Sequence, residues 1–590
     1  MTTSHRMLAA AAGALSLAIA GIAVAAPVNV KIIAFNDFHG NLQPPGGSFG
    51  GKPAFQTGGA DYLAAYVAKL RAQNPDNNVL VHAGDMVGAS PLISALYRDE
   101  PTIEVMNRIG VDLASVGNHE FDHGKTELLR LQSGGCHPTD PNTCQGAAVG
   151  TPTPFEGAKF KYLAANVIEN ATGKPLFPRY VIKTFGGVRM AFIGMTLEGT
   201  PSIVSPSGVA GLTFNDEAQT VNSLIRTLRN QGVNAIVVVV HEGGAQSGPS
   251  PPFGGCNGFT GAIVDIVRTL DNSVDLIVSG HTHEAYVCQL QNVAGRSIPV
   301  TSAAAFGRLL TNIDVVLDTE TRDVVSITAA QVLVDRTDAT ITPNAQIATL
   351  VANYNTIVKP LANKVIGKIA GTFDGGTTAA CEHKAGDLIA DSQLAATAAP
   401  AFGGAVVAFM NPGGVRAAFS FASSGEGEGD GNVTYGEAFT VQPFGNSLVT
   451  LTLTGDQIRT MLEQQFVGCP NGQTVNRVLH PSAGFEYAWT HSIPPTCNRV
   501  DPASIKINGV VVDPLSSYRV TVNNFLADGG DKFAVLKNGT HRLGGAQDID
   551  AVTEYLKPTL LPAPGGTPLA PAPLIRIKRL DNLTRTCPDN

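Results

Sequence analysis

Five apolar stretches of strand length in this chain each end in side chains that can bind a metal ion. Runs such as NVKIIAF and NAIVVVV finish in carboxylate, imidazole or amide groups. In open α/β sheets, ligands bind beyond the carboxyl ends of the strands, so five such ends indicate one convergent site. We expect this site to hold two metal ions. The polar residues at the five ends are Asp37 and His39; Asp85; Asn118, His119 and Asp122; His241; and His281 and His283.

The spacing of these residues favours metal ligation. Asp37 and His39 are two positions apart, which places both side chains on one side of the backbone while the chain is extended. A carboxylate and an imidazole are a common ligand pair for zinc or manganese. Asp85 could bridge two ions, and Asn118 offers a neutral oxygen that suits a site rich in negative charge. Each residue alone could be an ordinary core or surface residue, so the prediction rests on all five strand ends together.

The elements that position these residues follow a β-α-β pattern. Strands alternate with helical patterns such as GGADYLAAYVAKLRAQ and AQTVNSLIRTLRNQ from residue 28 to about residue 335. We therefore predict a first domain at 27–340 with four layers, in which two sheets are sandwiched between helices (α-β-β-α).

A long helix and a second α/β domain are expected after the first domain. Apolar residues recur at helical spacing in ITPNAQIATLVANYNTIVKPLANKV, which predicts a connecting helix within 341–364. Beyond it come shorter strands such as GAVVAFMNP, NSLVTLTLTG and SYRVTVNNF, which we assign to a domain at 365–590.

The N-terminus resembles an export signal. His5 and Arg6 precede an Ala-rich apolar stretch from Met7 to Val24, and small residues follow, so we expect a signal peptide at 1–26 and a periplasmic or secreted protein. An uncleaved membrane anchor is the alternative, because the stretch is just long enough to span a bilayer. No comparable run occurs later, and we expect no stable membrane anchor in the mature protein.

Eight cysteines, an even number, suit an oxidising compartment. Sequence alone does not determine their pairing. Neighbours along the chain suggest Cys136 with Cys144, Cys256 with Cys288, and Cys469 with Cys497, which leaves Cys381 and Cys587. A cysteine-based zinc site is disfavoured because the chain has no C-x2-C spacing.

The order NDFHG, GD, GNHEFD, HEGG and GHTH resembles the calcineurin-like metallophosphoesterases. Beyond the connecting helix, NPGGVR, YGEAFTVQPFGN and NNFLADGGDKF are similar to the C-terminal domain of the 5′-nucleotidase family. The resemblance implies that Asp37, His39, Asp85 and His283 hold one divalent metal ion (zinc, manganese or similar), and that Asp85, Asn118, His241 and His281 hold the other. It further implies in-line attack of hydroxide on phosphorus, with His119 and Asp122 as the catalytic pair.

Residues of the second domain are implied in substrate recognition. Phe444 and Phe525 match the pair that stacks a nucleobase, Asn411 and Arg416 match a phosphate- or nucleoside-binding group, and Asp531 matches a carboxylate that binds ribose hydroxyls. Because metals and base-stacking residues lie in different domains, both domains must contact one substrate. The connecting helix is thus a hinge candidate.

Two segments depart from simple expectations. Where the family carries one or more arginines that bind phosphate, this chain reads CEHKAGD, in which Lys384 could substitute as a point charge. The segment EGEGDGNVTYGE, from Glu426 to Glu437, approaches a calcium-binding EF-hand loop but begins with Glu. We interpret it as an acidic surface turn.

The leading functional hypothesis is hydrolysis of nucleoside 5′-monophosphates to nucleoside and phosphate. Alternatives are 2′,3′-cyclic nucleotides, UDP-sugars or nucleoside diphosphates at the same site, or an inactive exported nucleotide-binding protein. The net charge of −8 over 590 residues provides no basic surface for duplex nucleic acid. A small nucleotide is therefore the expected partner, and the oligomeric state is not predicted.

Overall fold

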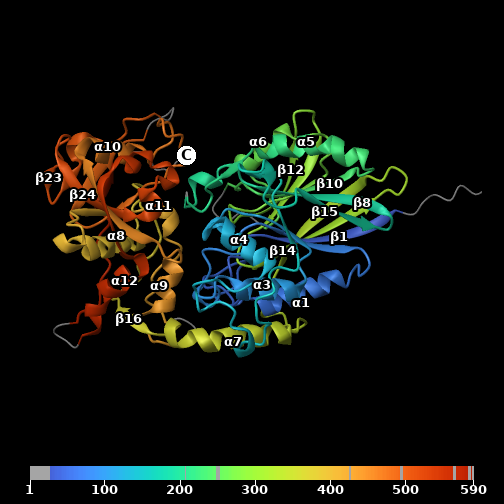
Figure 1. The fold of residues 1–590 in the computed structure, drawn as a ribbon, viewed down its shortest axis with the longest axis horizontal. Coiled ribbons are helices and arrows are strands. Elements are labelled where there is room, and N and C mark those ends of the chain that lie inside the picture. The colour runs from blue at the N-terminus through green and yellow to red at the C-terminus, as the bar shows by residue number, and fades with distance from the viewer. Residues whose placement is uncertain are drawn as a thin grey trace, which may run out of the picture.

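The computed structural model describes residues 27–205, 207–247, 253–423, 427–491, 496–561, 566–581 and 587. The expected signal peptide at 1–26 lies outside the described residues. Within those residues, no helix has the length and apolar character needed to cross a membrane. The N-terminal part (blue to green) and the C-terminal part (orange to red) lie side by side, and helix α7 (Ala345–Ala362) connects them in sequence (Figure 1).

Two six-stranded sheets form the centre of the N-terminal part. The first has the order β15-β14-β1-β2-β3-β4, and the second has the order β12-β13-β11-β10-β8-β7. Strands β1, β2, β3 and β4 run parallel, as do β8, β10, β11 and β13, and antiparallel strands extend both sheets. The bounds are β1 Val28–Phe35, β2 Asn78–Ala83, β3 Leu113–Ser115, β4 Lys161–Leu163, β7 Tyr180–Phe185, β8 Val188–Thr196, β10 Ala235–His241, β11 Leu276–Val278, β12 Ala285–Gln291, β13 Ser297–Ala303, β14 Leu309–Leu317 and β15 Val324–Leu333.

Central strands such as β1 and β10 are continuous apolar runs because both of their faces are buried. Successive side chains of a strand point to opposite faces. In β1, Ile32 packs between the two sheets, whereas its neighbour Ile33 packs toward the helices that cover the first sheet. In β10, Val239 and Val240 divide in the same way between the sheet interface and the helices of the second sheet.

Helices cover the outer face of each sheet, which confirms the expected α-β-β-α layering. The core of the first sheet includes residues of α1 (Ala60–Arg71), α3 (Glu100–Ile109) and α4 (Gly124–Ser133). The core of the second includes residues of α5 (Glu217–Asn230) and α6 (Ala262–Thr269). The short helix α2 (Leu92–Ala95) and a small sheet of β5 (Val167–Glu169), β6 (Lys174–Pro175) and β9 (Leu212–Phe214) complete this domain.

Helix α7 occupies the stretch where the sequence predicts a connecting helix. It begins after Asn344, whose side chain accepts from the backbone N–H groups of Gln346 and Ile347, and its buried side includes Leu350 and Tyr354. It packs on helices of the first domain and contacts α9 (Tyr435–Val441) of the second.

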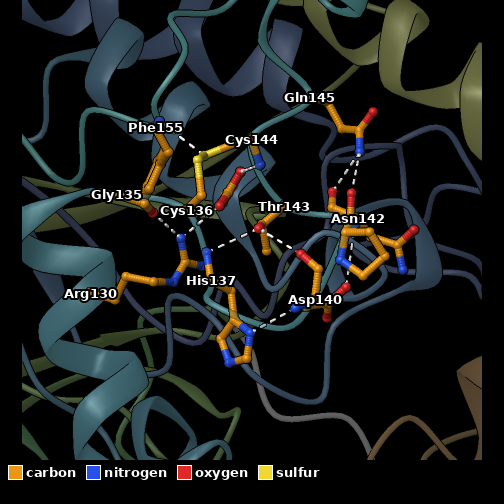
Figure 2. Close-up of a disulfide and its surroundings, with 12 residues drawn as sticks. Arg130, Gly135, Cys136, His137, Asp140, Asn142, Thr143, Cys144, Gln145 and Phe155 are labelled. Carbon is orange, nitrogen blue, oxygen red and sulfur yellow. Dashed lines mark hydrogen bonds and ion pairs between the residues drawn. A yellow bond between two sulfur atoms is a disulfide. The ribbon is translucent and has the colours of Figure 1, made fainter.

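All eight cysteines form disulfides, in the four pairs suggested by the sequence. Figure 2 shows the Cys136–Cys144 bridge, which closes a loop beside the end of α4. There Arg130 Nη1 donates to the Gly135 carbonyl oxygen at 2.7 Å, and the His137 backbone N–H donates to Thr143 Oγ1 at 3.0 Å (Figure 2).

The C-terminal part is a second α/β domain with two main sheets, ordered β20-β17-β24-β19-β25 and β23-β22-β21-β26. A two-stranded sheet joins β16 to β18. The bounds are β16 Val365–Lys368, α8 Lys384–Thr397, β17 Val407–Met410, β18 Asn432–Thr434, β19 Ser447–Thr454, α10 Gly455–Glu463, β20 His480–Pro481, β21 Phe485–Trp489, β22 Lys506–Ile507, β23 Val510–Val511, β24 Ser517–Asn523, α11 Asn524–Ala527, β25 Thr540–Gln547, α12 Asp548–Leu556 and β26 Ile577–Arg579.

The EF-hand-like segment ends in a helix cap. Glu437, at the last position of that pattern, accepts from the Thr434 backbone N–H at 2.8 Å, while Thr434 Oγ1 accepts from the Glu437 N–H. This capping box starts α9. Glu426, at the first position of the pattern, lies outside the described residues.

Candidate active site

The five predicted strand ends meet at one place, between the two sheets of the first domain. Asp37 and Asp85 follow the parallel strands β1 and β2, and Asn118 follows β3 in the same sheet. His241 ends β10, and His281 comes shortly after β11, its parallel neighbour in the second sheet. The facing sheets thus deliver their carboxyl ends to a shared cluster.

One group of the cluster consists of Asp37, His39 and His283. His39 Nε2 lies 3.8 Å from Asp37 Oδ1 and 3.1 Å from His283 Nε2, and His283 Nε2 lies 3.5 Å from Asp37 Oδ1. Nitrogen and oxygen atoms at this spacing, held in a largely buried position, can surround a single ion.

A second group consists of Asp85, His241 and His281, with Asn118 beside it. Asp85 Oδ2 lies 2.9 Å from His241 Nε2 and 3.7 Å from His39 Nε2, so this carboxylate lies between the two groups. The Asn118 side-chain oxygen lies 3.2 Å from His241 Nε2.

The imidazoles of the cluster are oriented for metal ligation. His39 Nδ1 lies 2.8 Å from the Gly88 carbonyl oxygen, and His241 Nδ1 lies 2.7 Å from that of Ala83. A carbonyl oxygen can only accept, so each Nδ1 carries a proton and each Nε2 is the nitrogen directed at the cluster. Burial lowers the pKa of His241, but Asp85 outweighs burial and raises it to about 10, so its Nε2 also holds a proton, which an ion would have to displace. Burial lowers the pKa of His283 to about 3, which keeps its ring neutral. Imidazoles and carboxylates together fit zinc or manganese.

The backbone around the ligands is not extended, and on this point the geometric argument from the sequence was wrong. Asp37, His39 and Asp85 have φ values of 49°, 46° and 55°. Each of these three residues lies in a loop that has left the strand, and the loops turn the side chains inward. Glycine is required beside them, because a Cβ at Gly117 would collide with the Asp85 carboxylate.

Glu120 is a structural residue of the site that the sequence argument missed. Its carboxylate accepts from the backbone N–H groups of Asp85 at 2.9 Å, Met86 at 2.7 Å and Gly117 at 2.5 Å. It therefore ties the loop after β2 to the loop after β3. Its position inside GNHEFD, two residues after Asn118, was the available signal.

His119 and Asp122 form a hydrogen-bonded pair next to the ligand cluster. His119 Nδ1 lies 2.8 Å from Asp122 Oδ2, and the His119 backbone N–H donates to Asp85 Oδ1 at 2.8 Å. Burial lowers the pKa of His119, but Asp122 and Asp85 outweigh burial and the net shift is upward. The pair therefore favours a protonated His119 imidazole.

Residues of both domains line one cavity over this pair. The first domain contributes Asn118, His119, Asp122 and His281; the second contributes the five predicted recognition residues, namely Asn411, Arg416, Phe444, Phe525 and Asp531. The Phe444 ring stacks on His119 with 5.7 Å between centroids, and the Arg416 guanidinium lies 5.8 Å from the Phe444 centroid. The structure thus brings together two sets of residues separated by about half the chain.

Lys384 does not take the place of the missing arginines. Its ammonium lies 3.5 Å from Asp374, and it is absent from the described residues that line the cavity. Arg477, which the sequence argument overlooked, does line the cavity and lies 3.2 Å from Asp531.

Comparison with known families accounts for both domains. Residues 30–285 match the calcineurin-like phosphoesterase model, and residues 365–538 match the model of the 5′-nucleotidase C-terminal domain. The chain is 32% identical over 542 residues to endonuclease YhcR of Bacillus subtilis, covering 90% of this chain but only 40% of that protein. It is 30% identical over 563 residues to cell wall protein Lmo0130 of Listeria monocytogenes, covering 91% of this chain and 68% of the relative.

A solved structure shows the same architecture over nearly the whole chain. The 5′-nucleotidase precursor of Thermus thermophilus superimposes with a TM-score of 0.74 at 26% identity, covering 94% of this chain and 100% of that one. The likeness extends through both domains.

Proposed function

The chain belongs to the calcineurin-like phosphoesterases that carry a 5′-nucleotidase C-terminal domain, and from this premise we propose that it hydrolyses nucleoside 5′-monophosphates to nucleoside and phosphate. One observation carries the proposal. A single cavity joins His119 and Asp122 of the phosphoesterase domain to Phe444 and Phe525 of the second domain. A phosphate at the first pair and a base at the second fit the two ends of one nucleotide.

Two divalent ions, zinc or manganese or similar, are the proposed cofactors. Asp37, His39, Asp85 and His283 would hold one, and Asp85, Asn118, His241 and His281 would hold the other, with Asp85 shared. Such ions supply Lewis acidity and lower the pKa of water toward neutrality. The close spacing of the ligand atoms supports this assignment.

The phosphoryl group is handled by residues of both domains. Arg416, whose guanidinium lies over the Phe444 ring, can donate two parallel hydrogen bonds to phosphate oxygens. His119, oriented by Asp122, donates a proton or hydrogen bond through Nε2 to a phosphoryl or leaving-group oxygen. Both contacts gain strength as negative charge develops on those oxygens in the transition state.

The nucleoside is held by the second domain. Phe444 and Phe525 stack the base, a contact that tolerates any base because each has a π-face. Asp531 accepts from ribose hydroxyls, and Asn411 positions it through a 3.0 Å hydrogen bond from Nδ2 to Asp531 Oδ2. Rotation of the second domain about α7 stays a prediction.

Export is part of the proposal. The signal-like segment at 1–26 and the four disulfides suit a periplasmic or secreted protein. One relative is named a cell wall protein, which supports a location outside the cytoplasm.

A phosphodiester substrate is the second candidate. It is favoured by the 32% identity to a protein named an endonuclease, although the chain spans 40% of that protein. Cyclic 2′,3′-nucleotides and UDP-sugars offer the same phosphorus chemistry to the same cluster.

Release of hydrolysis products by purified mature protein, resolved by chromatography, tests the proposal, because cleavage of a cyclic nucleotide, a dinucleotide or UDP-glucose need not free inorganic phosphate. AMP, UMP, 2′,3′-cyclic AMP, UDP-glucose and a dinucleotide are compared after chelation and after re-addition of zinc, manganese or magnesium. We expect metal-dependent release that is fastest from the 5′-monophosphates and lost in His119→Ala. A higher rate on the cyclic, diphosphate or dinucleotide substrates would replace the proposed substrate, and no metal-dependent release from any of them would refute an esterase role.

A further inference from the structure

Arg477 reaches the substrate cavity from a loop that lies outside every motif used above. The loop follows α10, and the Cys469–Cys497 disulfide closes it. Arg477 lines the same cavity as Phe444, Phe525 and Asp531.

Arg477 and Asp531 are joined in a closed ring of contacts with Gln473. Arg477 Nε lies 3.2 Å from Asp531 Oδ1, and Arg477 Nη1 donates to Gln473 Oε1 at 2.7 Å. Gln473 Nε2 in turn donates to the Asp531 backbone carbonyl oxygen at 2.6 Å. The guanidinium is therefore held on the carboxylate by a second contact from its own loop.

The turn that carries Asp531 needs such support. Asp531 and Lys532 have φ values of 52° and 62°, in the left-handed region that is costly for residues with a side chain. The loop fixes this turn from one side: Asn471 Nδ2 donates to the Lys532 carbonyl oxygen at 3.0 Å, and Lys532 Nζ donates to that of Gly472 at 2.6 Å.

The Asp531 carboxylate keeps lone pairs for a ligand. A carboxylate offers about four acceptor positions. Arg477 takes one on Oδ1, and Asn411 takes one on Oδ2. The Asn411 side chain is itself held by Asn523, whose Nδ2 donates to Asn411 Oδ1 at 3.0 Å. The Asp531 carboxylate is buried and borders the cavity, and its remaining acceptor positions suit two adjacent hydroxyl groups.

We propose that Arg477 is a positioning residue that holds the Asp531 carboxylate as a rigid acceptor for the ribose cis-diol, so that the enzyme selects ribonucleotides over analogues without hydroxyls. The inference rests on the proposed function, because it assumes that a nucleoside occupies the cavity. The proposal assigns selection of the sugar to the loop that the Cys469–Cys497 disulfide closes.

Nucleoside binding tests this selection without relying on hydrolysis. Dissociation constants of adenosine and 2′,3′-dideoxyadenosine are measured by calorimetry for the full chain, Arg477→Met and Arg477→Lys. Arg459→Met, which removes an exposed arginine of α10 in the same domain, is the matched control.

We expect the unaltered protein to bind adenosine roughly tenfold or more tightly than the dideoxy analogue, since the analogue lacks the hydrogen bonds to a charged acceptor. Arg477→Met should lose most of this ratio and Arg477→Lys should keep part of it, with melting temperatures recorded to show that each variant is folded. The control should keep the full ratio.

Two outcomes would overturn the inference: no preference for adenosine in the unaltered protein, or an unchanged preference in both Arg477 variants, including the case in which the two ligands are weakened equally. Phosphate release from AMP by the unaltered protein is measured separately. If AMP is not hydrolysed while the adenosine preference depends on Arg477, the proposed function fails and the sugar-selecting role stands.

Discussion

Asparagine in place of Asp122 should reduce turnover while leaving the shape of the site unchanged. Asp122 Oδ2 lies 2.8 Å from His119 Nδ1. An asparagine oxygen can accept the same hydrogen bond, so the ring keeps its orientation and tautomer. What the substitution removes is the negative charge that favours a protonated His119.

The structure bounds the size of the effect. Hydrogen bonds to charged groups contribute about 1.5–3 kcal/mol and neutral ones about 0.5–1.5 kcal/mol, so the typical values differ by about 1 kcal/mol. Unit charges 2.8 Å apart interact by about 6 kcal/mol at an effective dielectric constant of about 20, which is an upper bound. Because the pair borders an open cavity and bound ions would offset its charge, we expect a 10- to 100-fold fall in kcat for AMP, or about 1.4–2.7 kcal/mol.

The assay is a double-mutant cycle in kcat for AMP. It uses Asp122→Asn, His119→Ala and the double variant, with Asp456→Asn on the exposed surface of α10 as a matched charge control. If Asp122 acts through His119, its substitution should cost little more once His119 is absent. Because Asp122 raises the pKa of His119, the alkaline decline of kcat should also move to lower pH in Asp122→Asn.

An equal cost of Asp122→Asn in the presence and absence of His119 would refute this reasoning. It would mean that Asp122 acts on the substrate or the metal ligands directly. A rate unchanged by Asp122→Asn would refute the role of the charge altogether.

Three further predictions follow from other contacts. Glu120→Ala leaves three backbone N–H groups without their acceptor. Urea denaturation should therefore show a free energy of unfolding lower by about 2–5 kcal/mol, and chelator competition should show a 10- to 100-fold weaker metal affinity. An unchanged denaturation midpoint would contradict this prediction. Phe444→Ala and Phe525→Ala should each weaken adenosine binding by about 1–3 kcal/mol in calorimetry, and unaltered affinity in both would exclude stacking between them. Burial raises the pKa of Glu217 to about 7 from 4.5, so the folded protein holds this proton after the unfolded chain has lost it and stability falls as pH rises between those values. The melting temperature of Glu217→Gln should therefore exceed that of the unaltered protein by a margin that grows from pH 4.5 to pH 7. The corresponding difference in free energy of unfolding should reach about 3 kcal/mol. A difference that does not change with pH would argue against a buried, protonated Glu217.

Features marked by residue type and local spacing in the sequence agreed with the structure. Residue type and position relative to a strand end sufficed to predict that the candidate metal ligands lie together, because parallel strands in facing sheets deliver their carboxyl ends to the same edge. The cysteine pairs also agreed with the expectation, and three of them join near neighbours in the chain. The Cys381–Cys587 pair followed only because those two cysteines remained.

Contacts between distant loops were not visible in the sequence. Glu120 was passed over because nothing in GNHEFD shows that its carboxylate accepts from the loop after β2. Arg477 was passed over because it lies 54 positions before Asp531, in a loop without a recognisable pattern. The argument that Asp37 and His39 project together from an extended chain failed because both residues adopt left-handed backbone conformations.

The sequence by itself determined the order of the two domains and the residues available to bind metal, and its motifs, through their resemblance to a known family, indicated the class of chemistry and the residues available to bind nucleotide. These depend on residue type, spacing and alternation of apolar side chains, which are local properties of the chain. Only the tertiary structure decided that His119 and Phe444 share one cavity, that Lys384 is turned to Asp374, and that Arg477 faces Asp531. Those facts depend on how loops from different strands and domains pack, and that packing is set by contacts between residues far apart along the chain.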